Sequence, residues 1–72
     1  MSSERMEFIT IEISNVKAET SKAFLLVLES TGEEKWVPRA TLAKADDDSL
    51  YAGMGSCTVR IHDWFARKEN LI

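Results

Sequence analysis

Cys57, His62 and Asp63 are the residues whose types could perform nucleophilic chemistry, because an imidazole that a carboxylate orients can activate a thiol. Their spacing opposes this chemistry. If residues 57–61 are extended, Cys57 and His62 point to opposite faces of the strand. We therefore expect Cys57 to be buried as a small hydrophobe. We predict that the protein is not an enzyme, since one histidine and one cysteine on opposite faces supply little material for an active site.

Two further motifs suggest a metal or a nucleotide and fail on their spacing. A calcium loop that starts at Asp46 needs an oxygen ligand where the chain has Leu50 and a bidentate glutamate where it has Cys57. The stretch over residues 53–55 lacks the third glycine of a dinucleotide fingerprint, and no Walker lysine follows it. The sequence predicts no metal site and no cofactor.

The remaining candidates for function are side chains suited to binding a macromolecule. Trp, Tyr and Arg are the usual energetic anchors of protein interfaces, and aromatic and basic side chains on a barrel face also grip single-stranded nucleic acid. The candidate contact residues are Trp36, Arg39, Tyr51 and Arg60. For Trp36, a place in the core and a place at a contact are equally compatible with the sequence. Nine basic and twelve acidic residues give a net charge of −3, which disfavours nucleic acid as the partner.

The elements that position these residues are mostly strands. Residues 8–16 alternate between apolar and polar side chains, with Ile9, Ile11 and Ile13 on one face, which predicts a half-buried strand. Residues 23–29 are apolar on both faces, as in a central strand. With the glycine-containing turn and the extended stretch before Pro38, they predict a hairpin over residues 22–37.

The second half of the chain is less regular. Residues 40–45 fit either a short strand or a helical turn, and residues 46–55 have loop composition, with Leu50 and Tyr51 expected to pack back onto the body. Residues 57–61 predict a last strand with the side chains of Cys57, Val59 and Ile61 inward. After it, we expect a short helix to run to Lys68, with Asp63 as its cap and Trp64 in the core.

These elements predict a mainly β fold: a small, strongly bent antiparallel sheet or barrel of the OB-like or SH3-like kind, with four or five strands and a short C-terminal helix. An open α+β sheet is the alternative. The 72 residues form one small domain, 1–72, in which residues 1–6 are expected to be flexible. A barrel this small can complete its core by forming a homodimer, and the leftover strand over residues 8–16 is the expected seam.

Composition also predicts where the protein resides. The single cysteine permits no internal disulfide, no apolar run approaches the length of a membrane span, and the first residues lack the pattern of a signal peptide. We expect a cytoplasmic protein that does not bind membranes.

Three segments carry a resemblance to a known group. They are a lysine-led apolar strand (residues 22–27), a Trp-Val-Pro-Arg corner (within residues 32–42) and a closing segment with Trp64 (residues 59–72). In this order they resemble small proteins of bacteriophages and prophages. The chain departs from that pattern at Ala40, where serine is usual, and at His62 and Asp63, where Pro-Glu is usual. The resemblance implies a phage or bacterial cytoplasmic protein, and it transfers no catalytic residue.

These observations together predict a non-enzymatic, phage-type accessory module that binds a host or phage protein through Trp36, Arg39, Tyr51 and Arg60. A small barrel that binds single-stranded nucleic acid is the alternative. The two differ in salt dependence, because displacement of counterions from phosphates makes nucleic-acid binding fall steeply with salt.

Overall fold

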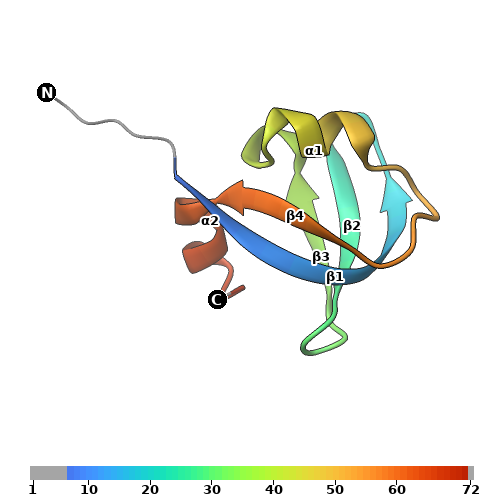
Figure 1. Cartoon of the computed structure of the whole chain (residues 1–72), viewed down its shortest axis with the longest axis horizontal. Helices are drawn as coiled ribbons and strands as arrows, with labels where there is room; N and C mark the ends of the chain where they lie inside the picture. The colour runs from blue at the N-terminus through green and yellow to red at the C-terminus, as the bar shows by residue number, and fades with distance from the viewer. Residues whose placement is uncertain (1–6, 72) are drawn as a thin grey trace, which may run out of the picture.

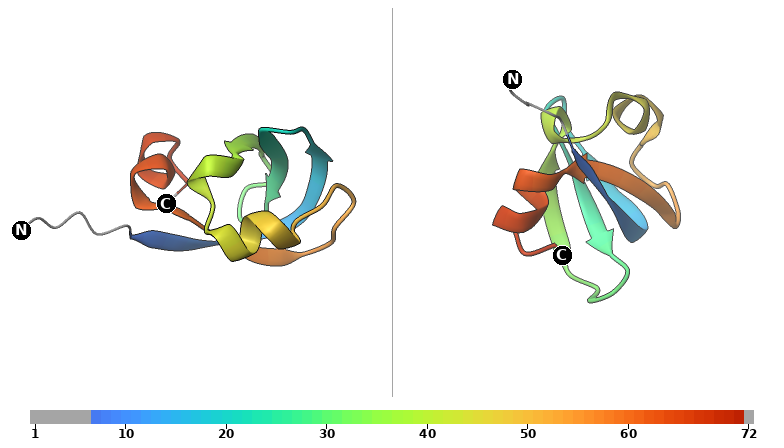
Figure 2. Two further views of the ribbon diagram at one scale, coloured as in Figure 1. Left: turned by 90° about the horizontal axis from the view of Figure 1, so that it is seen from above. Right: turned by 60° about the vertical axis from the view of Figure 1, so that its left-hand side comes forward.

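The computed structural model describes residues 7–71 and contains one antiparallel sheet of four strands (Figure 1). In their order across the sheet, the strands are β3 (Glu34–Pro38), β2 (Ala23–Leu28), β1 (Phe8–Glu19) and β4 (Cys57–His62). The predicted mainly β fold with a short C-terminal helix is confirmed, as a bent sheet that is not closed into a complete barrel (Figure 2). The N-terminal residues 1–6, predicted to be flexible, lie outside the described residues. In chain order the elements are β1 (Phe8–Glu19), β2 (Ala23–Leu28), β3 (Glu34–Pro38), the 3₁₀ helix η1 (Arg39–Thr41), α1 (Lys44–Ser49), β4 (Cys57–His62) and α2 (Asp63–Lys68).

The long strand β1 bends the sheet. Its first half pairs with β4, from Phe8 opposite His62 to Ile13 opposite Cys57, and its second half pairs with β2. The register shifts on either side of Val16, and such bulges kink a strand and increase its twist. β1 extends to Glu19, beyond the predicted end. β1 is a central strand between β2 and β4 and is therefore not left over, although β2 pairs only with its second half. The dimer seam over residues 8–16 stays a prediction.

The predicted hairpin over residues 22–37 is confirmed as β2 and β3, which pair from Ala23 opposite Pro38 to Val27 opposite Glu34. Along β2, Phe24, Leu26 and Leu28 are buried and the alternate residues are half-buried. Gly32 occupies the turn with a φ of +77°, a backbone conformation that glycine adopts without steric cost.

Between β3 and β4 the chain forms two short helices. Residues 40–45, for which the sequence fitted either a short strand or a helical turn, contain the end of η1 and the start of α1. The loop predicted over residues 46–55 is wrong up to Ser49, because α1 includes the three aspartates. Leu50 is buried as expected. Tyr51 is not: its side chain is 56% exposed.

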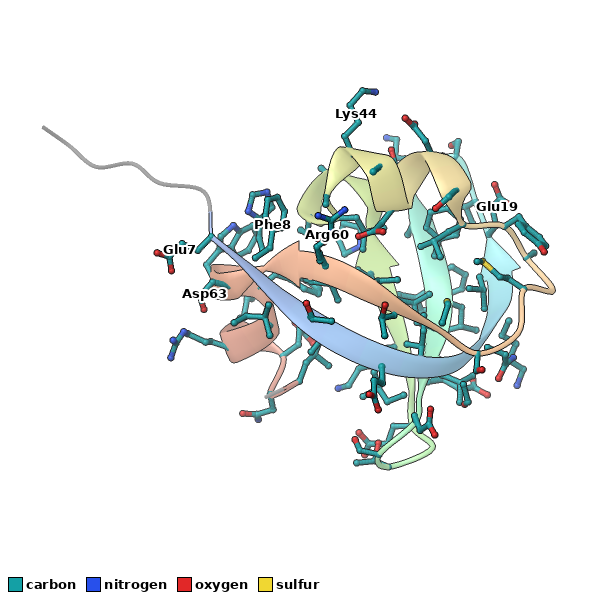
Figure 3. All side chains as sticks on the ribbon, in the orientation of Figure 1. Glu7, Phe8, Glu19, Lys44, Arg60 and Asp63 are labelled. Atoms are coloured by element: carbon teal, nitrogen blue, oxygen red, sulfur yellow. The ribbon has the colours of Figure 1, made fainter. Side chains whose placement is uncertain are left out.

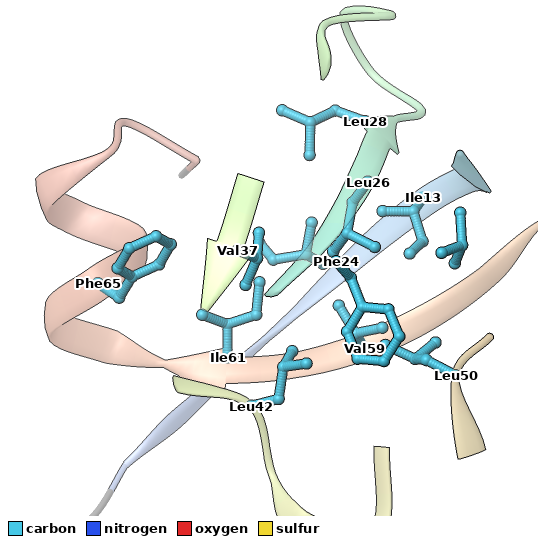
Figure 4. Close-up of a cluster of buried hydrophobic side chains, with 12 residues drawn as sticks. Ile13, Phe24, Leu26, Leu28, Val37, Leu42, Leu50, Val59, Ile61 and Phe65 are labelled. Atoms are coloured by element: carbon cyan, nitrogen blue, oxygen red, sulfur yellow. The ribbon is translucent and has the colours of Figure 1, made fainter. Parts of the chain in front are cut away.

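β4 and α2 complete the core (Figure 4). Val59 and Ile61 are buried as predicted, Cys57 is half-buried against the same cluster, and Phe65 covers one end of the sheet. Two predictions about α2 are wrong. Trp64 is 59% exposed, and Asp63 is the first helical residue, makes no capping hydrogen bond and instead accepts one from Arg67. The other members of the cluster are Ile11, Ile13, Val16, Phe24, Leu26, Leu28, Val37, Leu42 and Leu50.

Candidate functional site

The three residues that could have formed a nucleophilic site do not act together. Cys57 packs against the core, and burial, together with the negative charge of Asp46, raises the pKa of its thiol above the ordinary value of 9.0. His62 lies between the rings of Phe8 and Trp64, with ring centroids at 4.7 and 6.4 Å. The thiol is therefore kept protonated, and the imidazole is engaged elsewhere.

Each of the three consecutive aspartates has a different cationic partner. Asp46 accepts hydrogen bonds from both the backbone N–H (2.9 Å) and the side-chain Nε (3.2 Å) of Arg60. The Nε of Arg39 donates to Asp47 at 2.7 Å, and Asp48 lies 3.6 Å from the Nζ of Lys44 within the same helix. Within residues 7–71, no group of three or more His, Cys, Asp or Glu side chains is arranged to hold a metal ion.

Arg39 joins three parts of the fold. Its guanidinium lies 4.7 Å above the ring of Phe24, donates to the Thr20 carbonyl at 3.3 Å and lies 3.7 Å from the carboxylate of Glu19. With the bond to Asp47, these contacts connect α1 to the end of β1 and the start of β2. The side chain of Arg39 thus carries a structural role.

Arg60 has a similar role at the edge of β4. Its carbonyl accepts a hydrogen bond from the Ala43 N–H at 2.9 Å, while its own N–H donates to Asp46. Figure 3 shows Arg60 between β4 and α1, whereas Lys44 extends from the opposite side of α1. The two predicted contact arginines therefore both hold α1 against the sheet.

Trp36 lies on the outer surface of the hairpin and is 51% exposed. The register places it beside Leu25, which lies beside Ala18, and these residues face away from the side that Phe24 and Val37 occupy in the core. The ion pair between Lys17 and Glu34 connects β1 and β3 beside them. We call this surface the outer hairpin face; its apolar members are Ala18, Ala23, Leu25, Val27, Trp36 and Pro38.

The four predicted contact residues come from separate elements and do not form one cluster. Trp36 lies on β3, Arg39 begins η1, Tyr51 follows α1 and Arg60 lies on β4. Both arginines are engaged by α1, and the two aromatic rings are exposed. The segment that holds Tyr51 is itself fixed to β1, because Gly53 N–H donates to the Val16 carbonyl (2.8 Å) and Val16 N–H donates to the Met54 carbonyl (2.9 Å).

Sequence reasoning missed an exposed aromatic cluster of Phe8, His62 and Trp64 at the junction of β4 and α2. The ring of Phe8, 39% exposed, lies against His62 with the ring planes tilted by 30°, and His62 in turn stacks on Trp64 with the planes 27° apart. The alternation of β1 contained the signal, because a strand that buries Ile11 and Ile13 turns Phe8 outward.

A shallow depression of about 260 Å³ lies beside the first half of β1. Residues from β1, from the turn after β2 and from the C-terminal segment line it: Thr10, Ile11, Glu12, Glu29, Ser30 and Leu71. It contains no thiol or imidazole, so it adds no nucleophile to those already described.

Comparisons with protein-family models, with curated proteins and with solved structures found no match to this chain. The resemblance to bacteriophage proteins therefore stays a prediction. Among the described helices, none is long and apolar enough to cross a membrane.

Proposed function

We propose that this chain is a non-enzymatic accessory module that binds another protein, through the outer hairpin face around Trp36. The observation that carries the proposal is that β2 has apolar side chains on both faces of the sheet, while the core covers only one of these faces. Leu25 and Val27 lie half-exposed beside the exposed ring of Trp36. Tryptophan at the centre of an apolar surface is a typical anchor of protein interfaces.

The same geometry favours a protein over a nucleic acid as the partner. Arg39, Arg60 and Arg67 are all paired with aspartates, and Lys17 is paired with Glu34. Cations that are already neutralised contribute little to phosphate binding, and the chain as a whole carries a net charge of −3. In this proposal Trp36 makes the main contact, and a contact by Tyr51 is an additional expectation. A phage origin and a place in the bacterial cytoplasm belong to the same proposal and rest on the sequence alone.

The experiment compares two exposed tryptophans on different surfaces. The wild-type chain, Trp36→Ala and Trp64→Ala are immobilised and exposed to bacterial lysate. We expect a protein that the wild type and Trp64→Ala retain and Trp36→Ala loses by at least tenfold, the effect of removing an interface anchor. A protein retained equally by Trp36→Ala would contradict the assignment of this face.

A labelled single-stranded oligonucleotide, titrated at about 50 and about 200 mM salt, tests the alternative partner. We expect no binding at either salt concentration. Binding that weakens steeply with salt would overturn the protein-binding proposal in favour of nucleic acid.

A further inference from the structure

The first half of β1 has one edge that no strand of the described sheet occupies. β4 pairs with β1 over Phe8 to Ile13, but β2 begins to pair only at Ile13. The last bond on the β2 side runs from the Glu29 N–H to the Glu12 carbonyl, at 3.2 Å. After Glu29 the chain enters the turn between β2 and β3, so on this side no strand of the described sheet lies beside the part of β1 that precedes Glu12.

The direction of the backbone groups follows from the pairing with β4. Arg60 directs its N–H toward Asp46 and its carbonyl toward Ala43, both away from β1. In an antiparallel pair of strands, opposite residues alternate between bonding each other and directing both backbone groups outward. Thr10, which lies opposite Arg60, accordingly directs its own N–H and carbonyl away from β4. Glu12, two residues further on, does the same, as its bond to Glu29 shows. Within residues 7–71, no backbone partner is found for Thr10 on this side.

There is space beside this edge for an extended chain. The depression of about 260 Å³ adjoins Thr10 and Glu12, and Ile11 and Leu71 supply apolar lining. Its lining thus comes from the first half of β1, from the turn that joins β2 and β3 and from the C-terminal segment.

The charge at the edge selects the kind of chain. Glu12 and Glu29 are both exposed and both line the depression. Neither forms an ion pair among the described residues, unlike the aspartates of α1. Two unpaired carboxylates beside free backbone groups complement an extended segment that carries lysine or arginine.

We propose that a short, extended, basic segment of the partner protein adds to the sheet at this edge, paired with β1 through the backbone of Thr10. The inference rests on the proposed function, because it assumes that the partner is a protein. It adds a second contact, distinct from the outer hairpin face. Backbone hydrogen bonds supply the affinity of such an added strand, and Glu12 and Glu29 supply the preference for basic side chains.

The test uses an isotope-labelled full-length chain and two synthetic pentapeptides, one alternating lysine with valine and one alternating glutamate with valine. We expect the lysine peptide to shift the amide resonances of Thr10, Ile11, Glu12 and Leu71, and the glutamate peptide to bind at least tenfold more weakly. Trp36→Ala should bind the lysine peptide as well as the wild type does. This variant therefore distinguishes a wrong assignment of the outer hairpin face from a wrong assignment of the β1 edge.

Two variants at one position isolate the backbone donor. Thr10→Pro removes the N–H that faces the depression but leaves the β1–β4 hydrogen bonds intact, since proline is tolerated where the N–H points away from the sheet. Thr10→Val changes the side chain and keeps the donor. We expect Thr10→Pro to weaken lysine-peptide binding at least tenfold and Thr10→Val less than twofold. Equal binding by the two variants would overturn the proposal.

A modified peptide covers the case in which Thr10→Pro does not fold. Methylation of alternate backbone nitrogens of the lysine peptide removes its donors along one edge, without changing the protein. We expect methylation at one of the two alternate sets to abolish binding to the wild type. Undiminished binding of both methylated peptides would show a purely electrostatic contact and contradict strand addition.

Discussion

At the scale of single residues, the three aspartates of α1 show how one residue type takes different roles at adjacent positions. Asp46 occupies the edge of β4 by accepting the N–H of Arg60, and Asp47 binds Arg39 above the ring of Phe24. Asp48 pairs only within α1, with Lys44. The acidic run was visible in the sequence, but the partners depend on how η1 and β4 approach the helix, which no local pattern encodes.

The thiol of Cys57 gives a prediction about pH. Its pKa lies above 9.0 because burial, and secondarily Asp46, disfavour the thiolate. A pKa that is higher in the folded state contributes stability below the unfolded pKa, and this stability is lost as the pH rises through the folded pKa. We expect urea unfolding midpoints of the wild type to fall between about pH 8 and about pH 10.5 more than those of Cys57→Ser.

Asp46→Asn supplies a second readout for the same thiol. Removal of the nearby negative charge should lower the pKa of Cys57, so that its alkylation by iodoacetamide accelerates at a lower pH than in the wild type. The reference is Asp48→Asn, which removes one charge from the same helix. If the two variants alkylate alike, the carboxylate of Asp46 does not act on the thiol.

The two tryptophans show the limit of residue-level prediction. The sequence left Trp36 open between core and surface, and it placed Trp64 in the core because the helix it begins must cover the sheet. α2 follows β4 directly, so the strand sets the rotation of the helix. That rotation directs Phe65 and Ala66 into the core and Trp64 outward. Helical periodicity predicts which residues share a face, but not which face turns inward over six residues.

At the scale of elements, α1 depends on its neighbours for its position. It has no buried residue of its own, and two ion pairs, Asp46–Arg60 and Asp47–Arg39, hold it against the sheet. An element with few buried contacts opens more readily than the core. We therefore expect α1 to undock locally while β1, β2 and β4 stay paired.

Amide hydrogen exchange of Asp47→Asn and Asp48→Asn checks this expectation. Both variants remove one charge from α1, but only Asp47→Asn removes a bond to the rest of the fold. We expect the amides of residues 47 and 50 to exchange roughly twofold to fivefold faster in Asp47→Asn, as for loss of one partly exposed ion pair, and no faster in Asp48→Asn. The amide of Phe24 serves as the internal reference. Equal acceleration in both variants would indicate a general weakening of the helix.

The strands were more predictable than the helices, for physical reasons. Strict alternation identified β1 and β4, and the turn chemistry at Gly32 identified the hairpin. The end of β1 was missed because the bulges around Val16 break the alternation on which the prediction relied. The free edge beside Thr10 was unforeseeable, since it follows from where β2 stops pairing and not from any residue type.

At the scale of the whole molecule, the pairings of β1 differ greatly in sequence distance. β1 meets β2 across a short turn, but it meets β4 only after β2, β3, η1 and α1, about half of the chain. Closing a long loop costs more chain entropy than closing a short one. The three-stranded unit of β1, β2 and β3 should therefore form before β4 docks.

Folding kinetics test this order with two buried residues. Leu26→Ala alters the early unit and Val59→Ala alters β4, and each removes a fully buried side chain at a cost of about 1–4 kcal/mol. We expect Leu26→Ala mainly to slow folding and Val59→Ala mainly to speed unfolding, measured by stopped-flow fluorescence across a urea series. The reverse assignment would show that β4 takes part in the rate-limiting step.

The central position of β1 has a consequence for the chain as it is synthesised. Until residues 57–62 have been added, the edge of β1 at which Ile9, Ile11 and Ile13 later pair with β4 has no partner strand. An unpaired, isoleucine-rich edge is a template for other nascent chains. Glu12, between two of these isoleucines, and the acidic residues of α1, which are added before β4, place like charges on neighbouring copies during that interval. Like charges at this position oppose the pairing of one nascent chain with another before β4 closes the sheet.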